Sequence, residues 1–423
     1  MTASTPLLDE LAWRGLLHQQ TEGLGAHLAQ PRSLYCGFDP TAPSLQIGNL
    51  VPVMLMVHLA RAGHVCIALV GGGTAMIGDP SGRSAERPLL SANEIDTNAA
   101  KIDEQLNRVF KAAGTSGVTG ANNATWLREV RMIEFMRDVG KHFSVNYMLA
   151  KDSVQSRLEG GISYTEFSYM LLQSYDFLEL QKRYGVTVQV GGSDQWGNLT
   201  AGVELLRRSA AVEAHALTAP LVTTSSGKKF GKSEGGAVWL DSAMTSPYKF
   251  YQFWVNTEDA DAGRYLRMFT FHSRAEIEAL EAEHATAPHE RAAQKALARA
   301  MTTMLHGAAA TAVVEEASRI VFDKKADPAT ISDEVFGTLA REIPSVRIAA
   351  QGDLPVLDVL EQAFAQSRSA GKNLLQQGSV TVNGVKLGAD ATSVPASSAV
   401  RGRWFLVRKG GRDVAVAELI PPA

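Results

Sequence analysis

Residues 34–62 read LYCGFDPTAPSLQIGNLVPVMLMVHLARA and contain an apolar run, a polar turn and a helical pattern, in that order. The run Leu34–Phe38 is typical of a strand that is covered on both faces, as in parallel sheets. The pattern Leu45–Ala62 predicts a helix, with Ser44 as its N-cap and Gly63 just beyond its end. Pro52 should bend this helix or limit its first turns. We therefore expect one strand–helix unit of an α/β fold.

Three further apolar runs have the same character: Val65–Val70, Val186–Val190 and Ala216–Thr223. Strands that alternate with helices predict a Rossmann-like parallel sheet with right-handed crossovers. More than a hundred residues separate the second run from the third, too many for one crossover. We expect a helical insertion at about 93–183 within a catalytic domain spanning 1–224.

The rest of the chain predicts smaller parts. Residues 225–322 combine a Gly-rich loop with an α-helical domain, in which Ser273 and Glu276 form a capping box. A second helix should run from about Glu290 to Leu305 and stop at Gly307. Residues 323–345 are rich in Lys, Asp and Pro and are predicted to be a linker. Residues 346–423 then form a small α+β domain.

Composition excludes several classes of protein. Hydrophobic residues make up 45% of the 423, and charged residues 20%, which is ordinary for a globular chain. No apolar run approaches the length of about 20 residues that a membrane span needs. Asp9, Glu10 and Arg14 argue against a signal peptide. The two cysteines favour a reducing, cytoplasmic location, and the histidines show no zinc spacing, so we expect neither zinc nor a membrane.

Charge is unevenly distributed along the chain. From Val346 onward there are nine Lys+Arg against six Asp+Glu, which gives +3, whereas the whole chain is −3 and the remainder is therefore −6. A basic end on an acidic body indicates an appended RNA-binding module.

The first candidate site follows the first strand. Tyr35–Thr41 stand where ligands of open α/β sheets bind, and the helix start after them carries Gln46, Gly48 and Asn49. Gly48 would let a nucleotide approach the backbone, and the two amides could donate to phosphate. The alternative is a capped helix with two exposed amides.

Two Gly-rich segments offer further candidates. Gly71–Pro80 follows the second strand, but it lacks the acidic residue about twenty positions on that a dinucleotide-binding fold requires, so we reject a dehydrogenase. Gly227–Ser233 has three residues between its glycines where a Walker A loop has four. It instead predicts a loop that closes its lysines over a polyphosphate. The alternative is a solvated basic loop.

Taken together, these motifs resemble the two-part signature of class I aminoacyl-tRNA synthetases. One part opens the first helix, and a Lys-x-x-Lys-Ser loop follows the last strand. The flanking sequence resembles the bacterial tyrosyl-tRNA synthetase family along almost the entire chain. The matching segments are 35–41, 77–81, 140–147, 161–177, 191–198, 229–233 and 246–256.

The resemblance implies a tyrosine pocket. Tyr35 and Asp176 match the pair that binds the phenol hydroxyl, and Asn123 matches a residue that orients Asp176. Asp79, Tyr169, Gln173 and Gln195 complete the set of tyrosine-binding residues. Tyr169, Gln173 and Asp176 also stand at i, i+4 and i+7, so one helix can present all three on the same face.

The resemblance also implies an ATP site. Asp39, Gly48, Gly192, Asp194 and Lys232 are expected to bind ATP, and Mg²⁺ should accompany it. Expected catalytic residues are Thr41, Gln46, Asn49, Arg83, Arg87, Lys229, Lys232 and Ser233. The tyrosine carboxylate would attack the α-phosphorus, and the lysines would stabilise charge on pyrophosphate. Tyrosine then passes to tRNA(Tyr).

The C-terminal residues resemble the small RNA-binding fold that bacterial tyrosyl-tRNA synthetases share with a ribosomal protein. Basic side chains expected to face phosphate are Arg368, Lys372, Arg401, Arg403, Arg408, Lys409 and Arg412. The alternative is a stabilising appendage. The family further implies that the α-helical domain within 225–322 binds the anticodon. It also implies a homodimer that forms contacts through the helical insertion.

One departure from the family concerns Gln46 and Asn49, which stand where the family commonly has two histidines. Because the chemistry needs donors rather than proton transfer, we expect activity to survive. The alternative is a catalytically weakened paralogue that binds RNA or regulates. A tryptophanyl enzyme fits Tyr35 and Asp176 less well, and an acceptor other than tRNA stays open.

Overall fold

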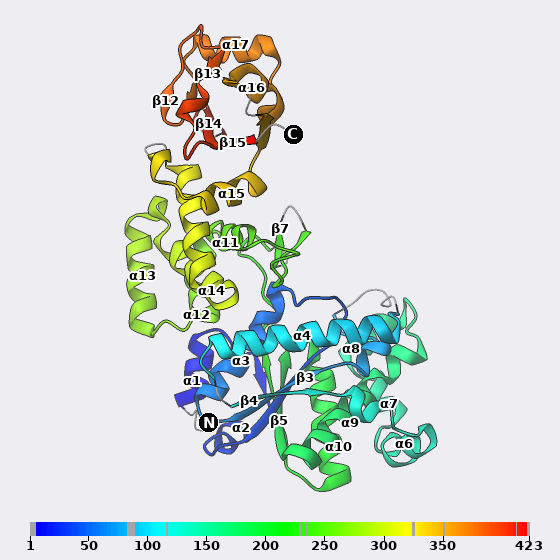
Figure 1. The fold of residues 1–423 in the computed structure, drawn as a ribbon. Helices are drawn as coiled ribbons and strands as arrows, with labels where there is room; N and C mark the ends of the chain where they lie inside the picture. Colours follow the sequence, from blue (N-terminus) through cyan, green and yellow to red (C-terminus); the bar gives the residue numbers. More distant parts are fainter. Residues whose placement is uncertain are drawn as a thin grey trace. The chain divides into compact units, whose positions relative to one another are not determined.

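A computed structural model describes residues 6–82, 89–115, 117–227, 230–233, 236–323, 326–349, 352–411 and 413–420 (Figure 1). The chain divides into two compact units. One joins Met1–Thr245 to Asn256–Leu305, and the other joins Ser246–Val255 to His306–Ala423. The chain therefore passes from one unit to the other three times. The expected domain boundaries stay predictions.

The first unit is built on a six-stranded sheet with strand order β1-β6-β5-β2-β3-β4. The strands are β1 (Gln19–Gln20), β2 (Ser33–Phe38), β3 (Val65–Val70), β4 (Val118–Asn122), β5 (Val186–Gly192) and β6 (His215–Ala219). Neighbouring strands are parallel except for β1, which pairs antiparallel with β6. The predicted α/β class with a parallel sheet is confirmed, and all four predicted strands are present.

Strand β4 was not predicted and lies within the helical insertion expected at about 93–183. Residues 118–122 pair with β3, from Cys66 opposite Val118 to Val70 opposite Asn122. They read VTGAN and lie half-buried or exposed at the edge of the sheet. An edge strand needs no dense apolar run, and this one contains a glycine, so the sequence signal was weak.

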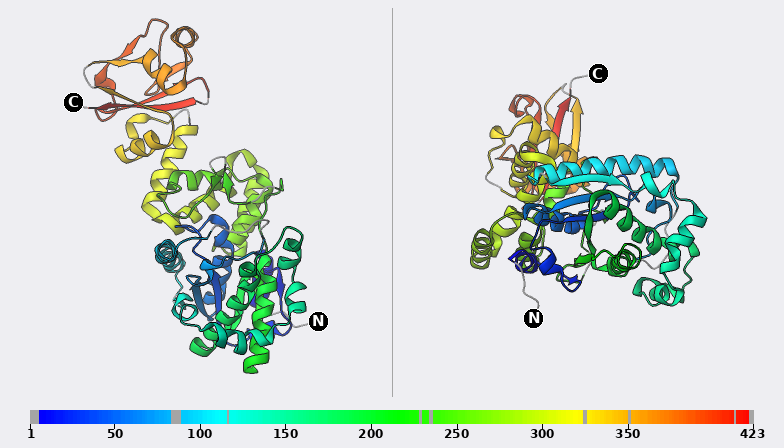
Figure 2. Two further views of the ribbon diagram at one scale, coloured as in Figure 1. Left: turned by 90° about the vertical axis from the view of Figure 1, so that its right-hand side faces the viewer. Right: turned by 90° about the horizontal axis from the view of Figure 1, so that it is seen from below.

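The helices of the first unit are α1 (Pro6–Trp13), α2 (Leu24–His27), α3 (Leu50–Arg61), α4 (Ala92–Ala112), α5 (Ala124–Leu127), α6 (Met132–Asp138), α7 (Val145–Leu149), α8 (Asp152–Leu158), α9 (Tyr164–Tyr184), α10 (Trp196–Ala210), α12 (Asp259–Phe269) and α13 (Arg274–Thr286). Some of them cover the two faces of the sheet. Helices α3 and α4 lie on one face, and α9 and α10 on the other (Figure 2). Short 3₁₀ turns are η1 (Ile47–Asn49), η2 (Thr74–Met76), η3 (Gly140–His142), η4 (Ser193–Gln195) and η5 (Pro288–Glu290).

The side chains of β2 and β3 alternate between these two layers. Tyr35 and Ile67 are buried in a core with Phe177 of α9 and Leu205 of α10. Cys66, one residue out of phase, lies beside the Met56 carbonyl of α3. Burial on both faces explains why these strands are apolar throughout.

The start of the first helix differs from the prediction. Ser44 is not its N-cap; its hydroxyl contacts Gln105 Oε1 and the Leu45 carbonyl and accepts from the Asp241 amide. The chain first forms η1, in which Asn49 Oδ1 accepts from the Gln46 amide at 2.9 Å. Pro52 then falls in the first turn of α3, where no backbone N–H is needed, and the helix tolerates it.

The predicted features near residues 273–307 are present. Ser273 caps α13, with Glu276 closing the capping box. Helical residues run from Ala292 to Phe322 as α14, with a break at Gly307, whose φ is 84°. That conformation suits glycine and interrupts the helix, as the sequence indicated.

The second unit contains α11 (Pro247–Val255), the end of α14 and a five-stranded sheet of order β12-β11-β14-β15-β9. Its other elements are β9 (Ser345–Ala349), β10 (Leu354–Pro355), α16 (Val356–Phe364), α17 (Arg368–Gln376), β11 (Val380–Val382), β12 (Val385–Lys386), β13 (Ser393–Val394), β14 (Trp404–Lys409), β15 (Asp413–Ile420), η6 (Pro328–Thr330) and η7 (Ala396–Ser398). Leu357, Leu360 and Leu375 of its helices share a core with Val380 and Phe405 of its sheet.

Helix α11 is covered by residues that come much later in the chain. Phe250 and Trp254 are fully buried. The Phe250 ring lies 5.2 Å from the His306 ring, and Gln252 Nε2 donates to Ser318 Oγ at 2.9 Å.

The predicted linker is wrong for residues 333–342, which form helix α15 (Asp333–Glu342). Val335, Phe336 and Leu339 are buried, and the Phe336 ring stacks on Trp404 at 5.5 Å. The prediction rested on the Lys, Asp and Pro residues around this segment and overlooked apolar residues at helical spacing within it.

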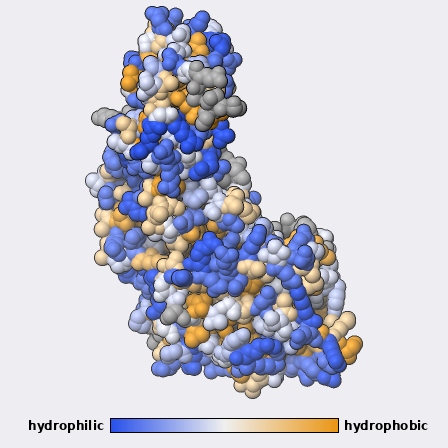
Figure 3. All heavy atoms as spheres, in the orientation of Figure 1, coloured by the Kyte–Doolittle hydropathy of each residue, from blue (hydrophilic) through white to orange (hydrophobic). Residues whose placement is uncertain are grey.

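On the surface drawn in Figure 3, polar and apolar side chains are interspersed. Within the described ranges, no helix combines the length and the apolar character that crossing a bilayer would require.

Candidate active site

A cavity of about 550 Å³ opens in the first unit where β2, β3 and β5 end. Its lining includes Tyr35, Asp79, Tyr169, Gln173 and Asp176. It also includes the other described residues that were predicted for tyrosine and ATP, except Lys232: Asp39, Thr41, Gln46, Gly48, Asn49, Asn123, Gly192, Asp194 and Gln195. Parallel strands present their carboxyl ends on one edge, so residues far apart in sequence converge here.

Asp176 is the central acceptor of the cavity. It is 2% exposed, and its carboxylate accepts from Asn123 Nδ2 at 2.8 Å and Trp126 Nε1 at 2.7 Å. Burial raises the pKa of Asp176 to about 8, and the bonds from Asn123 and Trp126 oppose that shift. Asn123 and Trp126 thus hold the Asp176 oxygens in place as hydrogen-bond acceptors in apolar surroundings, before any ligand binds.

Three buried polar atoms of the residues that line the cavity have no partner among the described residues. They are the hydroxyl of Tyr35, Oε1 of Gln173 and Oε1 of Gln189. The Tyr35 ring rests edge-on against Phe177, with centroids 5.3 Å apart. Because buried polar groups are rarely left unpaired, these atoms point to a polar ligand.

Asp79 is held by its own set of donors. Gln195 Nε2 donates to Asp79 Oδ2 at 2.5 Å, and the Ser81 amide donates to Oδ1 at 3.0 Å. Asn198 Nδ2 lies 3.4 Å from Oδ1 and 3.3 Å from Ser81 Oγ. This carboxylate is fixed at the cavity wall, where it can receive a cationic group.

Tyr169 and Asp39 form a third group. The Tyr169 hydroxyl donates to Asp39 Oδ2 at 2.8 Å, and Thr74 Oγ1 donates to Oδ1 at 2.7 Å. Burial raises the pKa of Tyr169 well above its ordinary value, so the hydroxyl stays protonated and can donate. Asp39, expected to bind ATP, therefore also organises the pocket around Tyr169.

The helix start offers room and donors for a phosphate. A Cβ placed on Gly48 would meet nothing within 4 Å, so its surroundings are open. Asn49, which lines the cavity, uses its oxygen to accept from the Gln46 amide, and its side-chain nitrogen remains a donor. Gly192 and Asp194 lie at the carboxyl end of β5. A Cβ on Gly192 would approach Asp194 Oδ1 to 2.5 Å, so this position has no room for a side chain.

The lysine loop is attached to this helix start. The Ile47 amide donates to the Val238 carbonyl, and Gln46 forms an antiparallel bridge with Trp239. Lys232 lies exposed in β7 (Lys232–Ser233), which pairs with β8 (Gly236–Ala237). Gly231 packs on Ile47, where a Cβ would approach Ile47 Cγ2 to 2.7 Å. Contacts of the backbone thus bring the two predicted motifs together.

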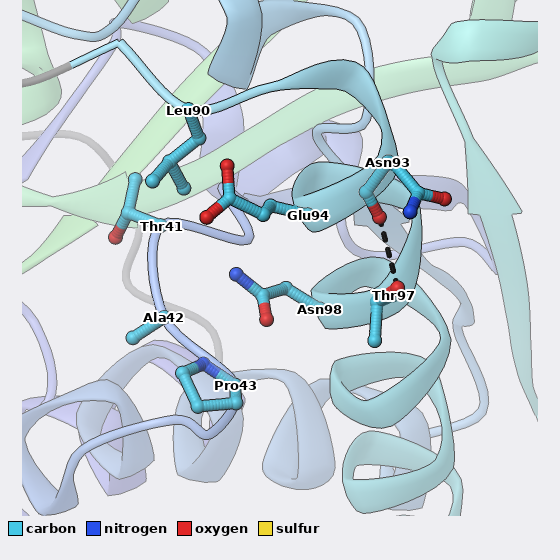
Figure 4. Close-up of a pocket in the computed structure, with 8 residues that line it drawn as sticks. All are labelled: Thr41, Ala42, Pro43, Leu90, Asn93, Glu94, Thr97 and Asn98. Atoms are coloured by element: carbon cyan, nitrogen blue, oxygen red, sulfur yellow. Dashed lines mark hydrogen bonds between the residues drawn. The ribbon is translucent and has the colours of Figure 1, made fainter.

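Thr41 lies between the main cavity and a neighbouring hollow of about 380 Å³. Figure 4 shows Thr41, Ala42 and Pro43 facing the first turns of α4 across this hollow. Asn98 Nδ2 of α4 donates to the Pro40 carbonyl at 3.3 Å, which anchors the segment that carries Asp39 and Thr41.

Some predicted residues lie outside the described part of the chain. They are Arg83, Arg87, Lys229 and Arg412, together with the side chain of Ser233.

The predicted RNA-binding residues are largely engaged within the second unit. Arg368 pairs with Asp358, Arg403 with Glu418, and Lys409 with Asp413. Arg408 donates to the carbonyls of Ile320, Val321 and Asp323, at the end of α14. Lys372 is exposed, and no described carboxylate pairs with it. Arg401 donates to the Ile331 carbonyl at 3.0 Å.

Sequence reasoning missed three residues that hold the site: Thr74, Trp126 and Asn198. Trp126 lies in α5, after β4, and donates to the Asp176 carboxylate. Asn198 lies in α10, after β5, and donates to the Asp79 carboxylate. Thr74 follows three glycines that had been weighed as part of a dinucleotide-binding turn. Polar residues just after strand ends were the available signal, but their partners depend on the packing of distant segments.

Comparison with known proteins is consistent with this geometry. Residues 28–323 match the family described as tRNA synthetases class I (W and Y), and residues 336–416 match the tyrosine–tRNA ligase SYY-like C-terminal domain. A tyrosine–tRNA ligase of Anaeromyxobacter dehalogenans is 49% identical over 418 residues, covering 98% of this chain and 99% of the relative. A tyrosine–tRNA ligase of Bacillus caldotenax is 47% identical over 411 residues, which cover 96% of this chain and 97% of the relative.

Solved structures agree in fold. A truncated mitochondrial tyrosyl-tRNA synthetase of Aspergillus nidulans superposes with a TM-score of 0.69 at 32% identity, covering 75% of this chain and 94% of that one. A tyrosyl-tRNA synthetase of Archaeoglobus fulgidus, with a TM-score of 0.53 and 18% identity over 72% and 99% of the two chains, shares the fold. By its sequence along nearly its whole length, the chain belongs to the tyrosyl-tRNA synthetase family of class I tRNA synthetases.

Proposed function

We propose that this chain activates L-tyrosine with ATP and transfers the tyrosyl group to tRNA(Tyr). The observation that carries the proposal is the buried, preorganised carboxylate of Asp176 in a cavity where the Tyr35 hydroxyl has no described partner. The family of the chain and the names of its relatives, tyrosine–tRNA ligases, support the same reading.

A phenol can form hydrogen bonds with the Asp176 carboxyl and the Tyr35 hydroxyl at the same time. Its hydroxyl donates to Asp176 and accepts from Tyr35. The side-chain oxygens of Asp79, Tyr169 and Gln173 then receive the substrate ammonium. Phenylalanine would leave the Asp176 carboxylate without this donor, at a cost of about 3 kcal/mol, which corresponds to a discrimination of about 100-fold or more. An indole N–H would leave the Tyr35 hydroxyl with no acceptor, which disfavours tryptophan.

The chemical step is an in-line attack by the tyrosine carboxylate on the α-phosphorus of ATP, which releases pyrophosphate. The carboxylate is ionised at neutral pH, so the protein's task is to position the reactants and to stabilise charge. Gly48 leaves space for the nucleotide, Asn49 donates to a phosphate oxygen, and Lys232 approaches from its loop. ATP enters as its Mg²⁺ complex, and tRNA then receives the tyrosyl group from the adenylate.

The presence of Gln46 does not imply that the protein is an inactive, RNA-binding paralogue. Its backbone amide closes the η1 turn, and its backbone bridges to Trp239, and both interactions are independent of its side chain. The side chain is exposed and retains an amide donor.

We also propose a homodimer formed through the helical insertion. Large apolar side chains are exposed there: Met132 at 71%, Ile133 at 77% and Tyr164 at 68%. Hydrophobic spheres are visible in Figure 3 at the edge where Figure 1 labels α6. Such a patch favours association between copies. Ile133→Asp should shift the protein to the monomer in sedimentation velocity, whereas Leu221→Asp, a change at an exposed leucine outside the insertion, should not.

Two free, buried cysteines support a cytoplasmic location.

The test of the activity is tyrosine-dependent exchange of pyrophosphate into ATP by the native chain and by Gln46→His. We expect exchange with tyrosine and at least 100-fold less with phenylalanine in kcat/KM. We also expect Gln46→His to change the rate by less than tenfold. No exchange in the native chain, with exchange restored in Gln46→His, would favour the RNA-binding paralogue instead.

A further inference from the structure

We propose that Thr74 is a positioning residue that couples the two parts of the tyrosine pocket, the part around Asp176 and the part around Tyr169. This inference rests on the proposed function, because it assigns Asp176 to the phenol and Tyr169 to the ammonium.

Hydrogen bonds connect the two parts without a break. Asn123 Nδ2 donates both to Asp176 Oδ2, at 2.8 Å, and to Thr74 Oγ1, at 3.0 Å. Thr74 Oγ1 donates in turn to Asp39 Oδ1 at 2.7 Å, and Asp39 Oδ2 accepts from the Tyr169 hydroxyl at 2.8 Å. Among the described residues, the Thr74 hydroxyl therefore links the two parts: it accepts from the Asn123 amide and donates to the Asp39 carboxylate.

The direction of these bonds is fixed by chemistry. The Asp39 carboxylate can only accept, and an amide nitrogen can only donate, so the single proton of Thr74 must point toward Asp39. The Gly71 carbonyl, at 3.3 Å, competes weakly for that proton. Thr74 is 2% exposed, so water does not offer an easy substitute for either bond.

The glycines before Thr74 make room for this link. A Cβ on Gly71 would overlap Asp39 Oδ1 and would lie 2.5 Å from Thr74 Oγ1. A Cβ on Gly73 would lie 2.8 Å from Leu127 and 3.3 Å from Asn123 Oδ1, which accepts from the Gly73 amide at 2.7 Å. The Gly-rich turn thus allows two carboxylate-bearing segments to be joined through one hydroxyl.

A consequence is that the phenol and the ammonium of tyrosine are not read independently. When a phenol docks on Asp176, it holds Asn123, and through Thr74 and Asp39 it fixes the Tyr169 hydroxyl. Changes at the two parts should therefore be non-additive, and Thr74 should carry their coupling.

The experiment is a double-mutant cycle of Asn123→Ala and Tyr169→Phe, in the native chain and in Thr74→Val, which replaces the hydroxyl by a methyl of similar size. The readouts are the Kd of L-tyrosine by calorimetry and the free energy of unfolding in urea without tyrosine. We expect a coupling of about fivefold to tenfold in Kd in the native chain, falling below twofold in Thr74→Val. Thr74→Ser, which keeps the hydroxyl, should retain it.

Thr218→Val is the matched control, because Thr218 is fully buried and accepts from the Gln19 amide at 3.1 Å in the same unit. It should lower stability as Thr74→Val does and leave the coupling intact. Additive effects in the native chain, or a coupling that persists in Thr74→Val, would overturn the role of Thr74. If the native chain binds no tyrosine, the proposed function fails, while the unfolding cycle still decides whether Thr74 links the two parts.

Discussion

At the scale of single residues, the pocket is built from polar groups whose environment fixes their protonation. The Asp176 carboxyl is buried, which disfavours its charge, yet Asn123 and Trp126 donate to it as they would to a carboxylate. The resemblance to the tyrosyl-tRNA synthetase family pointed to Asp176, Tyr169 and Gln173, and their helical spacing allowed them to share one face. The sequence could not point to Trp126, since nothing local indicates that this indole reaches Asp176.

The raised pKa of Asp176 makes stability depend on pH. Between the ordinary value near 4 and the folded value of about 8, the folded chain holds a proton that the unfolded chain has released. This group therefore lowers the free energy of unfolding as pH rises from about 4 to 8. Asp176→Asn removes the titration, so its stability relative to the native chain should increase between pH 5 and pH 8 in urea unfolding.

The same variant should weaken tyrosine binding about 100-fold, because an NH₂ group, which cannot accept a hydrogen bond, replaces one of the two carboxyl oxygens that receive Asn123 and Trp126. Asp152→Asn, at an exposed aspartate, is the control and should leave the pH dependence unchanged. Parallel stability curves for the native chain and Asp176→Asn would contradict this account of Asp176.

At the scale of elements, apolar density was sufficient to locate the four central strands and α3. It failed for β4, whose edge position requires little apolar surface, and for α15, whose charged surroundings obscured its buried face. The attachment of segment 238–240 to residues 45–47 was also not predictable, because backbone hydrogen bonds between distant loops leave no pattern in side chains.

This attachment can be tested at Gly231. Its φ is 83°, and a Cβ would approach Ile47 Cγ2 to 2.7 Å, so Gly231→Ala should lift the lysine loop from the helix start. We expect the rate of pyrophosphate exchange to fall at least tenfold with little change in KM for tyrosine. Gly227→Ala is matched, since its φ of 79° carries similar strain but a Cβ there meets nothing within 4 Å. Equal losses in the two variants would mean that backbone strain alone is responsible.

At the scale of the whole molecule, the fold class and the C-terminal α+β domain were predictable from segment order and charge, and the family model for residues 336–416 confirms that domain. The roles of its arginines were not predictable. An arginine that binds phosphate and one that binds a helix end look alike in sequence, and Arg408 is of the second kind in this structure.

Lys372 and Arg408 should therefore behave differently. Lys372→Gln should weaken tRNA binding and reduce the slope of log Kd against log salt by about 1, with stability unchanged within about 0.5 kcal/mol. Arg408→Gln should lower the free energy of unfolding by about 1–3 kcal/mol, because carbonyls of α14 lose their donor, and should leave the salt slope unchanged. Filter binding at several salt concentrations and urea unfolding separate the two. A reduced salt slope for Arg408→Gln would restore it as an RNA-binding residue.

The three passages of the chain between units have a consequence for synthesis on the ribosome. Helix α11 emerges about fifty residues before His306 and more than sixty before Ser318, which cover Phe250 and Gln252 in the finished protein. Until those residues have left the exit tunnel, the nascent chain carries an aromatic helix whose partners do not yet exist. The first unit likewise waits for residues 256–305, so its last part is made only after α11 of the second unit has emerged.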